Sequence, residues 1–394
     1  MSCSISISCQ SAKVVELHEK ARAFLQKAGV PMREAQLLAS SQIGVSAIVQ
    51  QEMPETVKHS ARREGLYTYS TPEGLSLSGN LLAYQNLLCR WPEPAVADCG
   101  ASMASLLGLE FAIATPTKWP RGSIAGWGTR TFVMGVLNAT PDSFSDGGRY
   151  LSVENALQHA REMIAAGVDI IDVGGESTRP GADWVSAAQE VERVVPVIRA
   201  LSEEVSVPIS IDTYKPEVAR AALAAGASII NDINGLRQAE MLSLAAETGV
   251  PVILMHMQGE PRTVQQNPSY QNVVAEVLDW LEQACNRAQA AGVKREQLII
   301  DPGIGFGKTT EHNLMLLRRL RDLRILGYPI LVGTSRKSLV GNVLQLPVDQ
   351  RSEGTAATVA AAILQGADIV RVHDVEAMRR VAVMSDAIAN VGDN

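Results

Sequence analysis

The sequence predicts an α/β protein in which residues 128–394 form a (β/α)8 TIM barrel behind an N-terminal extension that is partly helical or disordered. Eight short β-branched runs alternate with amphipathic helical stretches in this part of the chain, and a polar or glycine-containing turn follows each run. Eight strand–helix units match the length of a closed barrel. The alternative, a doubly wound open sheet, is disfavoured because no dinucleotide-binding fingerprint accompanies the units.

The strands are expected where β-branched residues gather between turn signals: Thr131–Leu137, Val168–Gly174, Val207–Ile211, Ser228–Asp232, Pro251–Met255, Gln297–Asp301, Tyr328–Gly333 and Asp368–Val372. The stretches between them are rich in Ala, Leu, Glu and Arg, which favour helix. The clearest helices are Val153–Ala166, Ala187–Glu204, Glu217–Ala225, Val273–Ala291 and Thr355–Gln365. Several end at a glycine in the C′ position, as at Gly226 and Gly366.

The first 127 residues differ from the barrel and are assigned to an extension of unknown role. Helices are expected at Val14–Ala28 and Arg33–Val49, whereas residues 52–102 lack sustained periodicity. Pro and Gly gather at 115–128, which predicts a linker. We therefore expect few contacts across this boundary, and a chain that begins near Pro120 should fold and retain activity. In the alternative, the first helix covers the amino-terminal mouth of the barrel.

Composition narrows the class of protein. A formal net charge of −7 and an isoelectric point near 5.5 argue against nucleic-acid binding. The longest apolar stretch, near Met103–Ala114, is too short to span a bilayer, and the first ten residues lack the basic region of a secretory signal. The five cysteines form no CxxC pair, so reduced thiols are expected. We expect a cytoplasmic protein without membrane or nucleic-acid partners.

Polar residues follow all eight predicted strands, at the end where such barrels place their chemistry. They are Asn138, Asp172, Asp212, Asn231, Asp232, His256, Asp301, Ser335, Arg336, Lys337, Arg371 and His373. Any one of them could be a satisfied core group, but a buried Asp or Asn is costly unless it binds something. Carboxylates and amides suit a heterocycle rich in N–H donors, whereas the basic groups suit phosphate. The set predicts a pocket for a ring compound that carries phosphate.

Two competing motifs are weaker. The run Gly303–Thr309 resembles a nucleotide-binding P-loop, but Pro302 stands where the first glycine is required, so the spacing fails by one residue. His256 and His373 could suggest zinc, but the His and Cys spacing of a zinc site is missing.

Seven segments beyond residue 128 resemble the signatures of the dihydropteroate synthases, a pterin-binding enzyme family. They are Val133–Gly148, Asp172–Gly181, Ser210–Lys215, Ile230–Ile233, Asp301–Lys308, Gly333–Ser338 and Arg371–Val375. Ala139 stands where a larger aliphatic residue is expected, which affects no catalytic role. The resemblance does not cover the first 127 residues, which lack the acidic metal-binding signature of the pathway kinase fused to some members.

The resemblance implies a transferase of folate biosynthesis, dihydropteroate synthase (EC 2.5.1.15). Its substrates are 6-hydroxymethyl-7,8-dihydropterin diphosphate and 4-aminobenzoate, and its products are 7,8-dihydropteroate and diphosphate. It also implies Mg2+ as cofactor and a homodimer formed through helices of the late barrel units.

The resemblance further assigns roles to individual residues. The pterin is held by Asp212, Asn231, Asp301 and Lys337. The diphosphate is held by Asn138, Arg371 and His373, with Mg2+ bridging Asn138 and phosphate oxygens and Asp172 supporting these residues from behind. The 4-aminobenzoate is bordered by Thr178, Arg179, Pro180, Phe306 and Ser335. The catalytic set comprises Lys337, Arg371, and Phe144 and Asp146 on a loop that closes over the reaction centre.

The implied reaction follows an SN1-like path, in which neutralised diphosphate leaves, the ring stabilises the cationic methylene carbon, and the aryl amine attacks from the opposite side. Two alternatives differ in class. A methyltetrahydrofolate-dependent methyltransferase would share the acidic pterin residues but would not need the basic set. A catalytically silent binding protein would have lost loop or anion residues, and none is missing.

Overall fold

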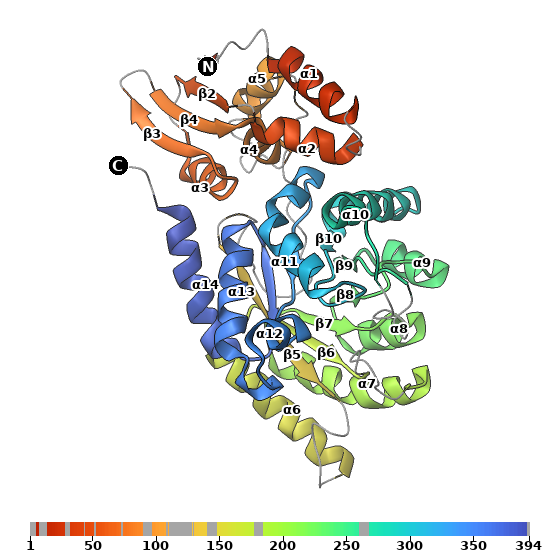
Figure 1. The fold of residues 1–394 in the computed structure, drawn as a ribbon. Coiled ribbons are helices and arrows are strands. Elements are labelled where there is room, and N and C mark those ends of the chain that lie inside the picture. The colour runs from red at the N-terminus through yellow and green to blue at the C-terminus, as the bar shows by residue number, and fades with distance from the viewer. Residues whose placement is uncertain are drawn as a thin grey trace.

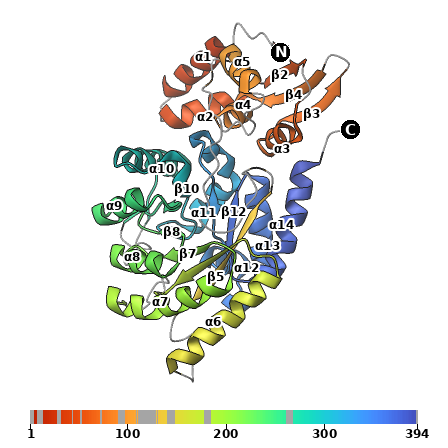
Figure 2. The ribbon, with the colours of Figure 1, turned by 180° about the vertical axis from the view of Figure 1, so that it is seen from behind.

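A computed structural model of the chain shows an N-terminal unit lying against one end of a barrel of parallel strands that is surrounded by helices (Figures 1 and 2). The residues that it describes are 5–7, 14–27, 32–42, 44–50, 53–71, 74–89, 97–107, 109, 128, 130–139, 148–176, 184–259 and 268–391.

Eight parallel strands form the barrel sheet in the order β10-β9-β8-β7-β6-β5-β12-β11, which confirms the predicted (β/α)8 barrel. The two outer strands of this order, β10 and β11, approach each other through one bridge, between Ile300 and Ile330. The strands are β5 (Phe132–Asn138), β6 (Ile170–Gly174), β7 (Ile209–Asp212), β8 (Ile229–Asp232), β9 (Val252–Met255), β10 (Leu298–Asp301), β11 (Leu331–Val332) and β12 (Ile369–Val372).

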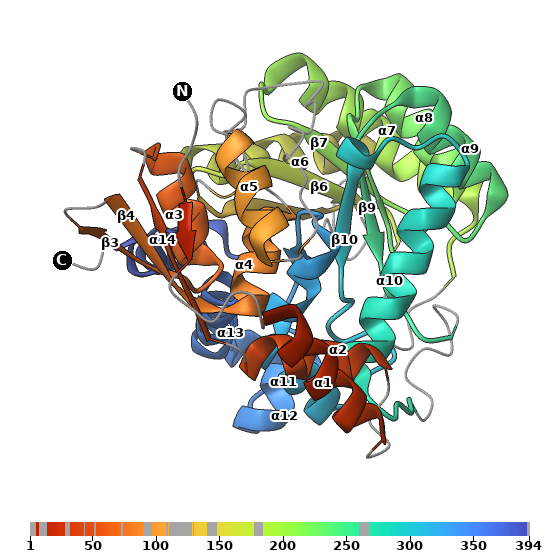
Figure 3. The same cartoon turned by 90° about the horizontal axis from the view of Figure 1, so that it is seen from above.

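Helices cover the outside of this sheet, as the view from above in Figure 3 shows. They are α6 (Gly148–Ala165), α7 (Ala187–Glu204), α8 (Pro216–Ala225), α9 (Ala239–Thr248), α10 (Val273–Ala290), α11 (Thr310–Arg318), α12 (Ser338–Leu344), α13 (Ser352–Leu364) and α14 (Val375–Asn390), with short 3-10 turns at Arg295–Gln297, Leu320–Leu326 and Val348–Gln350. Strand side chains alternate between two clusters. One packs against the helices, and the other consists of strand residues only, such as Phe132, Met134 and Ile253, and fills the barrel interior.

The N-terminal unit is partly helical, as expected, but it also contains an antiparallel sheet that the sequence did not predict. Its elements are β1 (Ile5–Ile7), α1 (Val14–Lys27), α2 (Met32–Gln42), β2 (Gly44–Val49), α3 (Glu55–Arg63), β3 (Tyr67–Thr71), β4 (Gly74–Asn80), α4 (Leu81–Leu88) and α5 (Ala97–Leu107), with strand order β1-β2-β4-β3. The expected helix at 33–49 is therefore wrong in its last third, where β-branched residues form β2. Buried Leu77, Tyr84 and Met103 give the unit its own core.

The unit contacts the amino-terminal end of the barrel through buried charges, so the expectation of few contacts across the boundary is wrong. Arg63 lies 3.0 Å from the carboxylate of Asp386 and donates to the carbonyl of Ala367. Arg324 binds both Glu64 and Asp368, and the side chains of all three are at most 4% exposed. These residues look like surface charges in the sequence, because their partners lie 44 to 323 positions away. Most of the predicted linker, 115–127, lies outside the described residues.

The thiols are not uniformly reduced, contrary to expectation: Cys99 is disulfide-bonded, whereas Cys89 and Cys285 are free. Within the described part of the chain, no helix is both long and apolar enough to cross a membrane.

Candidate active site

Arg371 at the end of β12 joins the carboxyl ends of three other strands. Its guanidinium donates to Asp172 of β6 and to Asp212 of β7, each across 2.6 Å. The amide of Asn231 on β8 donates to the same Asp172 oxygen across 3.1 Å. Parallel pairing places Gly174, Asp212 and Asn231 at matched positions, which brings these strand ends together. Four residues expected in one site are therefore in direct contact.

Lys337 and Asp301 form the neighbouring part of the same end. The Lys337 amine donates to the carbonyl of Ile304 and lies 4.7 Å from the centre of the Phe306 ring. Asp301 accepts a hydrogen bond from the Gly303 amide across 2.7 Å. Lys337 also interacts electrostatically with Asp301 and Asp212, which places it at the meeting point of the two groups.

Burial favours the uncharged forms of the two carboxyl groups and of the Lys337 amine. Desolvation raises the pKa of Asp212 to about 7, although Arg371 opposes this shift, and it raises the pKa of Asp301 as well. Desolvation also lowers the pKa of Lys337 to about 8. Arg371 stays charged, because Asp172 and Asp212 outweigh the effect of burial and raise its pKa. The site holds one carboxylate, Asp212, and one amine, Lys337, whose pKa values lie close to neutral pH, which is typical of functional sites.

One acceptor of this group has no partner. The Oδ1 atom of Asp172 is buried and makes no hydrogen bond within the described residues. An unsatisfied buried carboxylate oxygen is costly, and this one sits beside Arg371, where a bound donor or water would satisfy it.

Ser335 and His373 bring the last two strands together. The Ser335 hydroxyl lies 3.0 Å from His373 Nδ1 and accepts from the His373 amide across 3.2 Å. The residues expected beside 4-aminobenzoate and beside diphosphate are therefore neighbours. The adjacent Arg336 instead pairs with Asp374 across 2.6 Å.

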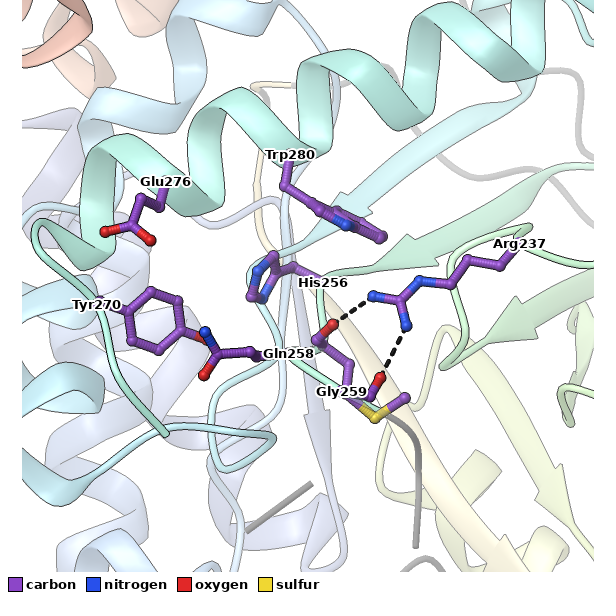
Figure 4. Close-up of a pocket in the computed structure, with 8 residues that line it drawn as sticks. Arg237, His256, Gln258, Gly259, Tyr270, Glu276 and Trp280 are labelled. Atoms are coloured by element: carbon purple, nitrogen blue, oxygen red, sulfur yellow. Dashed lines mark hydrogen bonds between the residues drawn. The ribbon is translucent and has the colours of Figure 1, made fainter. Parts of the chain in front are cut away.

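Two of the strand-end residues have local structural partners instead. Asp232 accepts from the amides of Asn234 and Leu236, each across 2.8 Å, and closes its own turn. His256 lies 2.9 Å from the amine of Lys308 and borders a pocket of about 300 Å3 beside β9. Arg237 also lines this pocket and donates to the carbonyls of Met257 and Gly259, and dashed lines in Figure 4 mark these two hydrogen bonds.

Several expected residues cannot be placed, because they lie outside the described residues. They are Phe144, Asp146, Thr178, Arg179 and Pro180. Lys215, which sequence reasoning missed, joins described residues on either side of this gap in the description. Its amine donates to Glu176 across 2.7 Å and to the carbonyl of Val185 across 2.8 Å. It also donates to the buried Glu190 across 2.5 Å. A lysine next to the strand-end Asp212 was the available signal.

Sequence reasoning also missed an apolar wall. Ile233, Met255 and Met257 form a small buried cluster against which Tyr214 and Phe306 pack. Apolar residues directly after β8 and at the end of β9 were the available signal. A wall of this kind beside carboxylates and amides suits a flat ring with polar edges.

The protein oxygen atoms at this end of the barrel suit Mg2+ only if other ligands complete its coordination. Asn138 lies at the exposed end of β5, and no group of three or more His, Cys, Asp or Glu side chains suited to a metal occurs within the described residues. Asp172 and Asp212 are already paired with Arg371. Mg2+ commonly keeps several waters and binds one or two protein oxygens together with substrate phosphates. Asn138 fits an ion held largely by the diphosphate.

Comparison with known proteins gives a consistent result. The family model for pterin binding enzymes matches residues 134–373. A dihydropteroate synthase of Synechocystis is 50% identical over 276 residues, which are 69% of this chain and 96% of that protein.

Solved structures agree with the sequence match. A dihydropteroate synthase from Clostridium difficile, determined in the presence of pteroic acid, is 46% identical with a TM-score of 0.64 and covers 68% of this chain and 100% of its own. One from Xanthomonas albilineans with 4-aminobenzoic acid is 45% identical with a TM-score of 0.63, covering 66% and 94%. With this agreement in sequence and in barrel fold, the chain belongs to the dihydropteroate synthase family of pterin-binding enzymes.

Proposed function

We propose that this protein condenses 6-hydroxymethyl-7,8-dihydropterin diphosphate with 4-aminobenzoate to give 7,8-dihydropteroate and diphosphate. The observation that carries the proposal is the contact of Arg371 with Asp172 and Asp212, beside Lys337 and Asp301. The group combines acceptors for an aminopyrimidine edge with cations for an anion, as the two ends of the pterin diphosphate require.

Each part of the site has a proposed role. Asp212, Asn231, Asp301 and Lys337 hold the pterin, whose ring lies against the wall of Ile233 and Met255. Arg371, His373 and Asn138 hold the diphosphate, and Mg2+ bound there would neutralise its charge. Ser335 and Phe306 border 4-aminobenzoate. Phe144, Asp146, Thr178, Arg179 and Pro180 complete the site according to the family signatures, and their roles stay predictions.

The proposed path begins with loss of diphosphate from the methylene carbon. Arg371 stabilises the charge that develops on the leaving oxygens. The carboxylates of Asp212 and Asp301 stabilise the positive charge that spreads over the ring, which requires that they be ionised. Phe306 holds the aryl amine near the carbon, the amine nitrogen forms the new C–N bond, and its proton leaves to solvent or diphosphate.

We also propose that the protein is a cytoplasmic homodimer. Large apolar side chains are exposed on α11, on α12 and in the turn after α12: Leu314, Met315, Val343, Leu344 and Val348. A second copy would cover this surface, which belongs to the late barrel units. Light scattering of the purified protein should give twice the chain mass, and Val343→Asp should reduce it to one.

The deciding experiment mixes the purified protein with pterin diphosphate, 4-aminobenzoate and Mg2+ and follows dihydropteroate by mass. Product that depends on both substrates supports the proposal. If no product forms, but a methyl group passes from methyltetrahydrofolate to an added corrinoid, the methyltransferase alternative is correct. If the pterin substrate binds without turnover, the chain is a silent binding protein.

A further inference from the structure

A tightly packed turn after β10 carries Phe306 to the site. Its residues Gly303, Gly305 and Gly307 have φ angles of +68°, +84° and +61°, which side chains other than glycine rarely adopt. A Cβ atom at Gly303 would lie 1.9 Å from the carbonyl oxygen of His256. The turn therefore has little freedom in sequence, and its position decides where the Phe306 ring lies.

Lys308 fastens this turn from the interior of the protein. Only 4% of the residue is exposed. Its amine donates to the carbonyls of Gly303 across 3.0 Å and of Phe306 across 2.9 Å, and it lies 2.9 Å from Nδ1 of His256. Burial lowers the pKa of His256 well below its usual value, so its imidazole is neutral and can accept this third bond. Burial also lowers the pKa of Lys308 to about 7. In its protonated form the amine uses all three donors within the protein.

The partner of Lys308 is itself held by aromatic residues. Figure 4 shows His256 between Trp280 and Tyr270. The His256 ring meets Trp280 edge to face at 5.1 Å between centres, and Tyr270 lies 6.2 Å away. The Tyr270 hydroxyl also donates to the carbonyl of Gly307 across 2.8 Å. The same group of side chains therefore holds both Lys308 and the far end of the turn.

A second lysine meets the turn from the opposite side. Lys337 donates to the carbonyl of Ile304 and lies over the Phe306 ring. The carbonyls of residues 303 and 306 bind the interior amine, whereas the carbonyl between them binds the amine in the site. Removal of the interior amine would take this donor from the part-buried Phe306 carbonyl and leave the Gly303 carbonyl with the Phe306 amide alone, so the turn would have to move to satisfy them.

We propose that Lys308 is a positioning residue that fixes the turn at 303–307 and thereby sets the place of Phe306 against 4-aminobenzoate. It touches neither substrate and acts through the turn. The kinetic part rests on the function proposed above, whereas the structural part does not.

The test compares Lys308→Met with a matched control, Gln297→Met. Gln297 is also 4% exposed and donates to two backbone carbonyls, those of Ala245 and Val250, but at the opposite end of β10. Hydrogen–deuterium exchange of the peptide that covers 303–307 is followed in both variants and in the unaltered chain. The KM for 4-aminobenzoate and the Kd for pterin diphosphate are measured alongside.

In Lys308→Met we expect the 303–307 amides to exchange about tenfold faster, and kcat/KM for 4-aminobenzoate to fall by about 10- to 100-fold, as small displacements of a reacting group cause. The Kd for pterin diphosphate should rise less than kcat/KM falls, because Asp301 and Lys337 bind the turn, whereas Asp212 and Asn231 are held by Arg371 and Asp172. Gln297→Met should leave all three values unchanged. Unaltered exchange at 303–307 in Lys308→Met would overturn the proposal, as would equal acceleration over the whole chain.

A second variant covers the case in which Lys308→Met does not fold. Asn313 accepts from the Gly305 amide across 2.8 Å and anchors the same turn from α11. Asn313→Ala should also speed exchange at 303–307 and lower kcat/KM for 4-aminobenzoate, both to a smaller degree. If the unaltered chain makes no dihydropteroate, the proposed function fails, and the exchange data alone decide the role of Lys308.

Discussion

The two ends of the barrel both bury arginines against carboxylates, but the two groups differ in what surrounds them. At the amino end, Arg324 lies between Glu64 and Asp368, and these side chains are nearly inaccessible. At the carboxyl end, the side chains of Arg371 and Asp212 are 23% and 15% exposed. The first group joins segments 260 residues apart, whereas the second joins strands of one sheet.

The difference teaches how a docking contact can be told from a reaction site. Buried charge occurs in both places, and so does a buried carboxylate oxygen with no hydrogen-bond partner among the described residues: Oε2 of Glu64 at one end and Oδ1 of Asp172 at the other. What separates them is access together with protonation near neutral pH, which Asp212 and Lys337 show. Charge that is sealed holds parts of the chain together, and charge that reaches solvent is available to a ligand.

The largest effect is expected at the carboxyl end. Arg371→Ala removes the cation that faces the leaving diphosphate, and turnover should fall by about 100- to 1,000-fold. The chain should remain folded with a lower melting temperature, because the buried Asp172 loses its cationic partner. The control is Arg379→Ala. Arg379 lies on α14, 3.6 Å from the carboxylate of Asp169, and this variant should stay active. Near-normal turnover of Arg371→Ala in steady-state assays would remove Arg371 from the anion site.

The next largest effect is expected on stability. A chain that begins at Pro120 loses the partners of Arg324 and Asp386 and exposes the amino end of the barrel. Loss of buried pairs costs about 3–5 kcal/mol, which lowers the melting temperature by about 10 °C for a domain of this size. Below that temperature we expect dihydropteroate formation to continue. Calorimetry and product assays on both chains decide, and equal melting temperatures would show that the docking contacts contribute nothing.

A single substitution sharpens the same comparison. Glu64→Leu leaves Arg324 with one carboxylate in place of two, and the free energy of unfolding should fall by about 3 kcal/mol. Glu55→Leu is the matched control, because Glu55 pairs with Lys58 on the exposed face of the same unit and its side chain is 64% exposed. Its loss should cost less than about 1 kcal/mol. Urea unfolding of both variants measures the difference, and similar losses would contradict it.

The smallest effect is a pH dependence of a few fold. Asp212 is ionised above its raised pKa of about 7, and Lys337 is protonated below its lowered pKa of about 8. The charged form of both exists mainly between these values, so kcat/KM for pterin diphosphate should rise and then fall around that window. Lys337→Arg keeps its charge and should lose the alkaline decline. A flat profile from about pH 6 to about pH 9 would contradict this assignment.

The sequence predicts the barrel and much of the site because both are local. Each strand run ends at its polar residue, and parallel pairing carries Asp212 and Asn231 to one edge whatever the details of packing. The contacts of Arg371 depend on closure of the sheet, which no local pattern states. The N-terminal sheet was missed because β3 and β4 are rich in Ser, Thr and Gly, and only Leu75 and Leu77 mark the apolar face of β4. Glu64 and Arg324 could not be paired, because nothing in either segment refers to the other.

The barrel sheet has one weak seam, between β10 and β11. β11 has only two residues, and a single bridge, Ile300 to Ile330, joins it to β10. Asp368 reinforces the seam by accepting from the Ile330 amide across 2.9 Å, and it is the same Asp368 that Arg324 ties to Glu64. The N-terminal unit thus supports the pair of strands whose carboxyl ends lead to Asp301 and Lys337. A segment without any reaction motif thereby helps to hold two residues of the site in place.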